Sequence, residues 1–128
     1  MEPSFSRLFT VEEANALLPE LEELLREIAV YRDQMREQAP HLEPILLSSA
    51  SNGGGRVGSE YGVEAYKLYL AAERIRGLGV LLKDLDMGLL DFPHERDGRV
   101  VFLCWYPPEE RISYWHEIQA GYGGRQPL

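Results

Sequence analysis

The apolar pattern of this chain changes period near residue 86, from the spacing of three and four typical of helices to the two-residue alternation of strands. Before that point, two long segments carry helical patterns on either side of a stretch rich in Pro, Gly and Ser. After it, short runs of branched and aromatic residues predict strands. We therefore expect an α+β fold, a long antiparallel helical hairpin followed by a small three-stranded antiparallel meander.

The first helical segment has a well-marked start. Thr10-Val11-Glu12-Glu13 is a capping box, in which the Thr10 hydroxyl accepts from the backbone of Glu13 and the Glu13 carboxylate reaches back. Apolar residues then repeat at three and four to about Gln38, which predicts one buried helix face. Pro19 lies too deep for a first-turn proline, so it should kink this helix or separate a short leading helix from it.

Residues 40–59 interrupt the periodicity and should form a flexible loop. The loop contains Gly53-Gly54-Gly55, but no Gly-Lys-Ser/Thr follows and no strand precedes it, so a connector is favoured over a phosphate-binding loop. A second helix is expected over 60–83, with Lys83-Asp84 closing it.

Strands are expected at 88–92, 99–106 and 112–118, with Asp97-Gly98 in the first hairpin turn. The chain should be a single domain, with the helical hairpin in 1–85, the meander in 86–120 and an irregular tail in 121–128. Because three short strands cover only part of such long apolar helices, the helices are expected to pair with a second copy in a homodimer.

The composition of the chain limits which classes of partner and which cellular compartment are expected. The 128 residues carry a formal net charge of −8, which repels phosphate backbones and anionic membranes, so no nucleic-acid or membrane partner is expected. The single cysteine fits a reducing compartment. No secretory signal or membrane-spanning stretch is visible, and a cytoplasmic protein is expected.

Side chains capable of binding a ligand gather after the second helix. Strand alternation places His116 on the more apolar face of the third strand, and antiparallel pairing could bring Cys104 to the same layer, which Asp91 could reach from an edge. The candidates for ligand binding are Asp84, Asp91, Cys104, Glu109, His116 and Glu117.

The sharpest hypothesis is a divalent-metal site of His116 with Asp91 and one of Glu109, Cys104 or Asp86, where Asp91, His116 and Glu109 form the leading set. Imidazole, carboxylate and thiolate together suit zinc or a similar ion. The alternative gives these residues core, turn and capping roles. A nucleophilic Cys104 is disfavoured because burial would raise its pKa.

The chain resembles the small prokaryotic proteins of domain of unknown function family 2203 over nearly its whole length. The residues that carry this resemblance are Phe9-Thr10-Val11-Glu12-Glu13-Ala14-Asn15-Ala16-Leu17-Leu18-Pro19, Gly79, Lys83-Asp84, Gly88-Leu89-Leu90-Asp91-Phe92-Pro93, Leu103-Cys104-Trp105, Trp115-His116-Glu117 and Gly121-Tyr122-Gly123-Gly124-Arg125-Gln126-Pro127. The resemblance implies a fold grouping and no established activity.

Three functions are open at this point. The first is binding of a small ligand or a divalent metal in a pocket where the second helix meets the meander. The second is a metal-assisted hydrolase in which Glu109 or Glu117 serves as the base. The third is a structural or adaptor module whose helices engage a partner protein. Arg125, on the glycine-rich tail, could reach an anion or a partner subunit, or lie on a disordered end.

Overall fold

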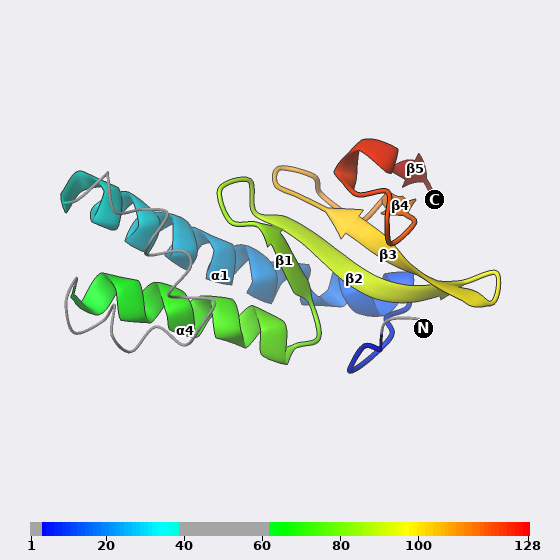
Figure 1. Ribbon diagram of the computed structural model, residues 1–128, viewed down its shortest axis with the longest axis horizontal. Helices are drawn as coiled ribbons and strands as arrows, with labels where there is room; N and C mark the ends of the chain where they lie inside the picture. Colours follow the sequence, from blue (N-terminus) through cyan, green and yellow to red (C-terminus); the bar gives the residue numbers. More distant parts are fainter. Residues whose placement is uncertain (1–3, 39–61) are drawn as a thin grey trace. The chain divides into compact units, whose positions relative to one another are not determined.

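The structure is a computed structural model that describes residues 4–38 and 62–128. In these ranges it contains helices α1 (Val11–Gln38) and α4 (Val63–Gly77) and a five-stranded sheet, so the predicted α+β class is confirmed (Figure 1). The chain forms two compact units, one of Met1–Glu22 with Ile75–Leu128 and one of Glu23–Arg74. The predicted loop 40–59 lies outside the described residues, and the single-domain organisation stays a prediction.

Helix α1 begins at the predicted capping box. The Thr10 N–H donates to Glu13 Oε1 at 2.8 Å, and the Glu13 N–H donates to Thr10 Oγ1 at 3.0 Å. The helix then runs without interruption to Gln38 and includes Pro19. The predicted end is therefore confirmed, and the alternative of a separate leading helix is wrong.

Helix α4 is shorter than the pattern of 60–83 predicts. It ends at Gly77, and Gly79 adopts a φ of 90°, a conformation that L side chains rarely adopt. The chain then enters strand β1 (Leu81–Asp84), so Lys83 and Asp84 lie in the sheet and do not close a helix. Leu and Lys favour helices in isolation, and here pairing with the next strand overrides that preference.

The sheet has five antiparallel strands in sequence order, so the predicted number of three is wrong. After β1 come β2 (Leu89–Arg96), β3 (Arg99–Trp105), β4 (Tyr114–His116) and β5 (Gln126–Pro127). The predicted turn at Asp97-Gly98 is confirmed, with φ of 51° and 79°, as a two-residue hairpin requires. The tail is also more regular than predicted, because it holds η2 (Tyr122–Gly124) and β5.

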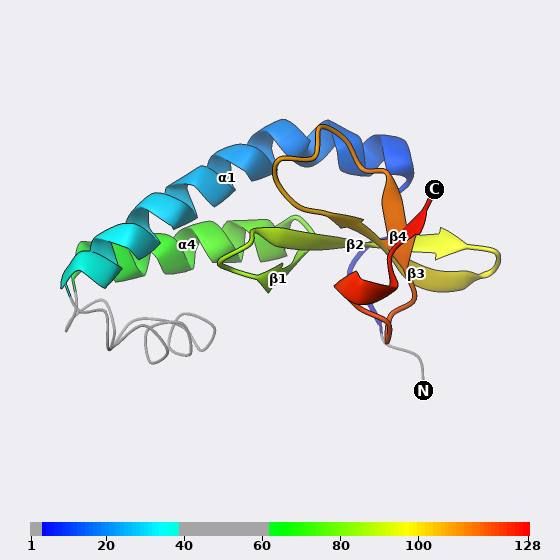
Figure 2. The ribbon, with the colours of Figure 1, turned by 90° about the horizontal axis from the view of Figure 1, so that it is seen from above.

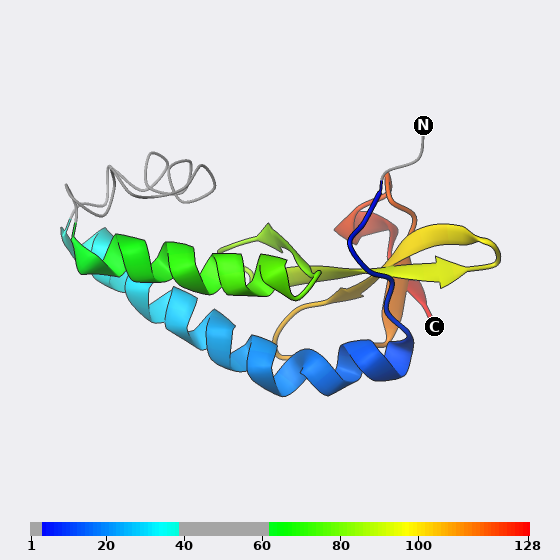
Figure 3. The same cartoon turned by 90° about the horizontal axis from the view of Figure 1, so that it is seen from below.

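The N-terminal segment crosses β2 at the part of the strand that β1 does not pair with (Figure 3). The Phe9 N–H donates to the Pro93 carbonyl at 2.7 Å. The Phe9 ring contacts Phe92 edge-on at 5.4 Å, and the Phe5 ring contacts Phe102 at the same distance. Because strand alternation places Phe92 and Phe102 on opposite faces of the sheet, this one segment covers part of both faces.

The segment between β3 and β4 extends toward the first half of α1 (Figure 2). There the Ile112 N–H donates to Asn15 Oδ1 at 2.8 Å, and the Ile112 side chain is buried. The sheet face toward these elements is apolar. It buries Leu90, Phe92, Val101, Leu103, Trp105 and Trp115.

In the unit Glu23–Arg74, Lys67 Nζ of α4 lies 5.9 Å from the centroid of the Tyr31 ring of α1. Within the described part of the chain, neither helix is long and apolar enough to cross a membrane.

Candidate metal centre

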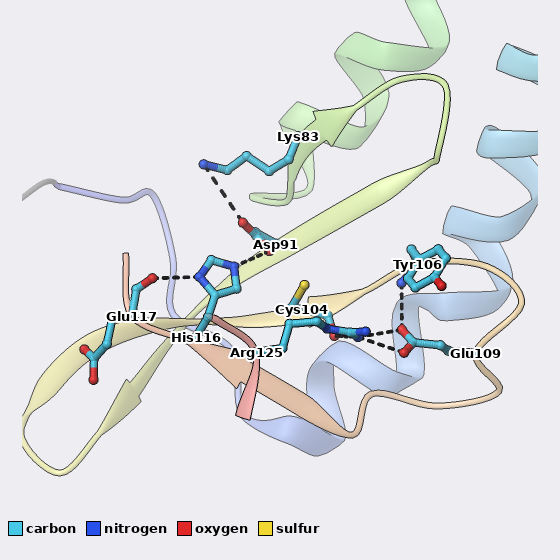
Figure 4. A network of polar contacts seen from close by, with 8 residues as sticks. All are labelled: Lys83, Asp91, Cys104, Tyr106, Glu109, His116, Glu117 and Arg125. Atoms are coloured by element: carbon cyan, nitrogen blue, oxygen red, sulfur yellow. Dashed lines mark hydrogen bonds and ion pairs between the residues drawn. The ribbon is translucent and has the colours of Figure 1, made fainter. Parts of the chain in front are cut away.

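Asp91, Cys104 and His116 lie on the same face of the sheet, on three neighbouring strands (Figure 4). Asp91 is directly opposite Cys104, and His116 is opposite Phe102, two residues along β3 from Cys104. Alternation therefore points all three side chains to one side. A carboxylate oxygen, the thiol sulfur and an imidazole nitrogen lie within 4.8 Å of one another. Within residues 4–38 and 62–128, no other three His, Cys, Asp or Glu form such a group.

This group is enclosed by the protein. Asp91 is 2% exposed, His116 is 1% exposed and Cys104 is fully buried. In the described part of the chain, Asp91 and His116 are the only polar or charged residues in the core. Burying such groups is costly unless they are paired or bind an ion, so this placement requires a physical reason.

The hydrogen bonds of His116 fix how its ring is oriented. Nδ1 lies 2.7 Å from the backbone carbonyl of Glu117, which can only accept, so Nδ1 carries a hydrogen. Nε2 lies 3.0 Å from Asp91 Oδ1. In a neutral imidazole Nε2 has a lone pair, and an ionised carboxylate has no hydrogen to offer it. The contact is therefore complete only with a second proton or with a cation between the two groups.

The Cys104 thiol is held in its protonated form. Burial, together with the neighbouring Asp91 carboxylate, raises the pKa of Cys104 to about 12, while Arg125 opposes the shift. The expected increase of this pKa is confirmed, and a free nucleophilic thiolate is disfavoured at neutral pH. A metal ion would replace the thiol proton, because the thiolate is the form that binds metals.

A lysine borders the group on its more exposed side. Lys83 Nζ lies 4.0 Å from Asp91 Oδ2 and 4.8 Å from the centroid of the Phe102 ring. The register of β1 against β2 shifts between Leu82 and Asp84, and Lys83 occupies this irregularity. Its side chain is 42% exposed, so it can move without disturbing the core.

Arg125 borders the group on the other side. One of its Nη2 hydrogens reaches the Cys104 carbonyl at 3.2 Å, and Nη2 lies 2.8 Å from each carboxylate oxygen of Glu109. The side chain is 12% exposed, and its buried Nε has no hydrogen-bond partner in the structure. The guanidinium also lies near three tyrosine rings, those of Tyr106, Tyr114 and Tyr122.

The other predicted candidates lie elsewhere. Glu109 accepts from Arg125 and from the Tyr106 N–H at 2.9 Å, outside the buried group. The carboxylate of Glu117 pairs with Arg99, while its backbone carbonyl holds His116. Asp84 accepts from the Met87 N–H at 3.0 Å and so stabilises the turn after β1. The structure brings together Asp91, Cys104 and His116 only.

Sequence reasoning did not include Lys83 and Arg125 among the site residues. Lys83 was assigned to a helix end, and nothing local distinguishes it from a surface lysine. Arg125 follows a glycine-rich segment. A buried guanidinium needs aromatic rings and a carboxylate as partners, and the sequence offers Tyr106, Tyr114, Tyr122 and Glu109. That combination is the signal from which its position could have been predicted.

The spacing of the group suits a first-row metal ion. Tetrahedral ligands at 2.0–2.3 Å from zinc lie roughly 3.3–3.8 Å apart. In this group, Nε2 and Oδ1 are 3.0 Å apart, and all three ligand atoms lie within 4.8 Å of one another. The expected ligand separations fall between these two distances. Small rotations of Asp91 and Cys104 would complete a three-ligand site. The hydrogen bond from Nδ1 to a backbone carbonyl is the support that metal-binding histidines usually have.

Comparison with known proteins gives one match. The model of a family described as "Uncharacterized conserved protein (DUF2203)" matches residues 7–128. No curated protein and no solved structure matches the chain.

Proposed function

Since the chain belongs to the DUF2203 family, whose description names no activity, we propose a function from the Asp91–Cys104–His116 group: the binding of one divalent transition-metal ion. Zinc suits the combination of nitrogen, oxygen and sulfur donors best. The single observation that carries the proposal is the convergence of a carboxylate oxygen, a thiol sulfur and an imidazole nitrogen in the core, with His116 Nε2 lying 3.0 Å from Asp91 Oδ1. A metal ion satisfies all three groups at once.

Binding is favoured over turnover. A metal-assisted hydrolase needs a base beside the metal-bound water, and the carboxylates of Glu109 and Glu117 are paired with Arg125 and Arg99 instead. The donors themselves are at most 2% exposed, which leaves little room for a large substrate. A reducing compartment such as the cytoplasm would keep Cys104 available as a ligand.

The test is metal analysis of protein purified without a histidine tag, followed by competition with a zinc-chelating dye. We expect about one zinc per chain, and a loss of affinity of at least about tenfold for His116→Ala, Asp91→Asn and Cys104→Ala. His94→Ala and Glu95→Gln are matched controls, because both residues lie on β2 outside the group. Wild-type protein that neither retains nor takes up zinc at micromolar concentration would refute the proposal.

We also propose that α1 and α4 form an antiparallel hairpin that pairs with a second copy in a homodimer. Large apolar side chains on α4, Val63, Tyr66 and Leu70, are 60%, 46% and 48% exposed and recur at helical spacing. Val30 of α1 is 52% exposed. Light scattering on a size-exclusion column should give a dimer, and Leu70→Glu should give a monomer. A wild-type monomer at micromolar concentration would overturn this arrangement.

A further inference from the structure

We infer that the metal ion takes its fourth ligand from solution, and that this ligand is a small monoanion held by Lys83. The inference rests on the proposed metal binding and adds the class of ligand that completes it. Zinc with three protein ligands keeps one open tetrahedral position. In the described part of the chain, no fourth donor belongs to the group, and the two long side chains beside it, Lys83 and Arg125, are cations.

The charges of the site leave room for one negative charge. A divalent ion with the Asp91 carboxylate, the Cys104 thiolate and a neutral His116 has no net charge. Arg125 is balanced by Glu109, which accepts two contacts of 2.8 Å from it. Lys83 then has no anion of its own, because Asp91, its partner at 4.0 Å, would be shared with the metal. A monoanion on the metal would give the Lys83 ammonium group a partner of opposite charge at the border of the buried group.

The position of Lys83 limits the size of this anion. The three donors are buried, whereas the Lys83 side chain is 42% exposed, so the half-exposed lysine lies between the site and solvent. In Figure 4 the ammonium group extends past Asp91, away from Cys104 and Arg125. Phe102, whose ring lies under the ammonium group, is itself covered by Phe5. The burial of all three donors therefore favours an anion of a few atoms over a bulky substrate.

The experiment uses the full chain loaded with Co²⁺, whose thiolate and ligand-field absorption bands report on coordination. Titration with azide, a small monoanion, should shift the ligand-field bands and saturate. Lys83→Met should weaken azide binding about tenfold or more, because it removes a charge-assisted contact. Lys83→Arg should restore most of the affinity. Lys67→Met is the matched control, because Lys67 is an exposed lysine of α4 in the other unit.

The outcomes separate this inference from the proposal on which it rests. If the cobalt–thiolate band is present but azide leaves the spectrum unchanged, the fourth ligand is internal and the inference fails while metal binding stands. If azide binds equally well to wild type and Lys83→Met, the role of Lys83 is wrong. If wild type shows no cobalt–thiolate band at all, the proposed metal site itself is refuted.

Discussion

At the scale of single residues, the two hydrogen bonds of His116 decide what its neighbour must supply. Since Nδ1 donates to the Glu117 carbonyl, a neutral ring needs a donor or a cation at Nε2. Without a metal, Asp91 supplies a donor only when its carboxyl group is protonated. If the carboxyl group is ionised, the His116 ring must carry the second proton. Asp91 and His116 can therefore form a hydrogen bond with each other in the metal-free protein and can both bind the ion when a metal is present.

Substitution of Asp91 separates these states. The amide of Asp91→Asn can donate to Nε2, so the metal-free variant should keep its stability within about 1 kcal/mol while zinc affinity falls. Asp91→Ala leaves Nε2 buried without a partner and should cost about 1–3 kcal/mol. Urea unfolding of both metal-free variants measures the difference. Equal losses in the two variants would show that the pair is an imidazolium–carboxylate ion pair whose charge contributes to stability.

Cys104 gives the metal-free protein a characteristic response to alkali. Its pKa is about 12 in the folded chain, against an ordinary value of 9.0. Between these values the folded state binds the proton that the unfolded state has lost, so stability falls as pH rises above 9. The slope is about 1.4 kcal/mol per pH unit at most.

The measurement is urea unfolding of wild type and Cys104→Ala from pH 7 to 10.5. The stability of wild type relative to the variant should be constant up to about pH 8.5 and then decline. Comparison with the variant removes the contribution of tyrosines and lysines, which titrate in the same range. Parallel pH profiles would mean that the thiol is not held in its protonated form.

At the scale of elements, the sequence predicts best where the pattern is long and local. The capping box and the three-and-four spacing of α1 lie within one segment, and both ends of the helix agree with the structure. The alternation of β3 and β4 likewise predicted that Cys104 and His116 share a face. Asp91 was expected at an edge, and it lies directly opposite Cys104 instead.

The elements that were missed depend on pairing between distant segments. Strand β1 consists of Leu81-Leu82-Lys83-Asp84, which has no strand preference of its own and is extended because it pairs with β2. Strand β5 has two residues, one of them proline. Since Lys83 and Arg125 reach the site only through β1 and the returning tail, local patterns could not place them there.

The change from α4 to β1 depends on Gly79. Its φ of 90° is strained for any L side chain, and an added Cβ would lie 2.7 Å from Arg7 Cγ. The side chain of Arg7 can move, so the backbone conformation should dominate, and Gly79→Ala should lower the free energy of unfolding by about 1–2 kcal/mol. Gly77→Ala is the control, because an added Cβ there meets nothing within 4 Å and φ is not positive.

Thermal or urea unfolding of the two variants tests this expectation. Gly77→Ala should be neutral or stabilising by up to about 1 kcal/mol, since alanine favours the helix. A Gly79→Ala variant as stable as wild type would show that the connection between α4 and β1 can adopt another conformation.

At the scale of the whole molecule, both ends of the described chain return to the one sheet. At the N-terminal end, the Phe9 N–H donates to Pro93 of β2. At the C-terminal end, Arg125 reaches the Cys104 carbonyl, and the Leu128 N–H donates to the Ser113 carbonyl at 3.0 Å. We therefore expect the order of the buried site to depend on the contacts of Arg125 with the Cys104 carbonyl.

A double-mutant cycle on Arg125 and Glu109 measures how strongly the tail is held. Either single substitution, Arg125→Met or Glu109→Gln, leaves a partly buried charge without its partner, whereas the double variant leaves none. We expect each single change to destabilise the protein and the pair to show a coupling energy of about 1–3 kcal/mol in urea unfolding.

The matched cycle uses Arg99→Met and Glu117→Gln, the same residue types in a more exposed pair, and should give a smaller coupling. Arg125→Met should also weaken zinc binding, since the donor to the Cys104 carbonyl is lost. Stability that falls while zinc affinity is unchanged would mean that the tail stabilises the sheet without ordering the site. Equal coupling energies in the two cycles would show that burial of Arg125 does not strengthen its ion pair with Glu109.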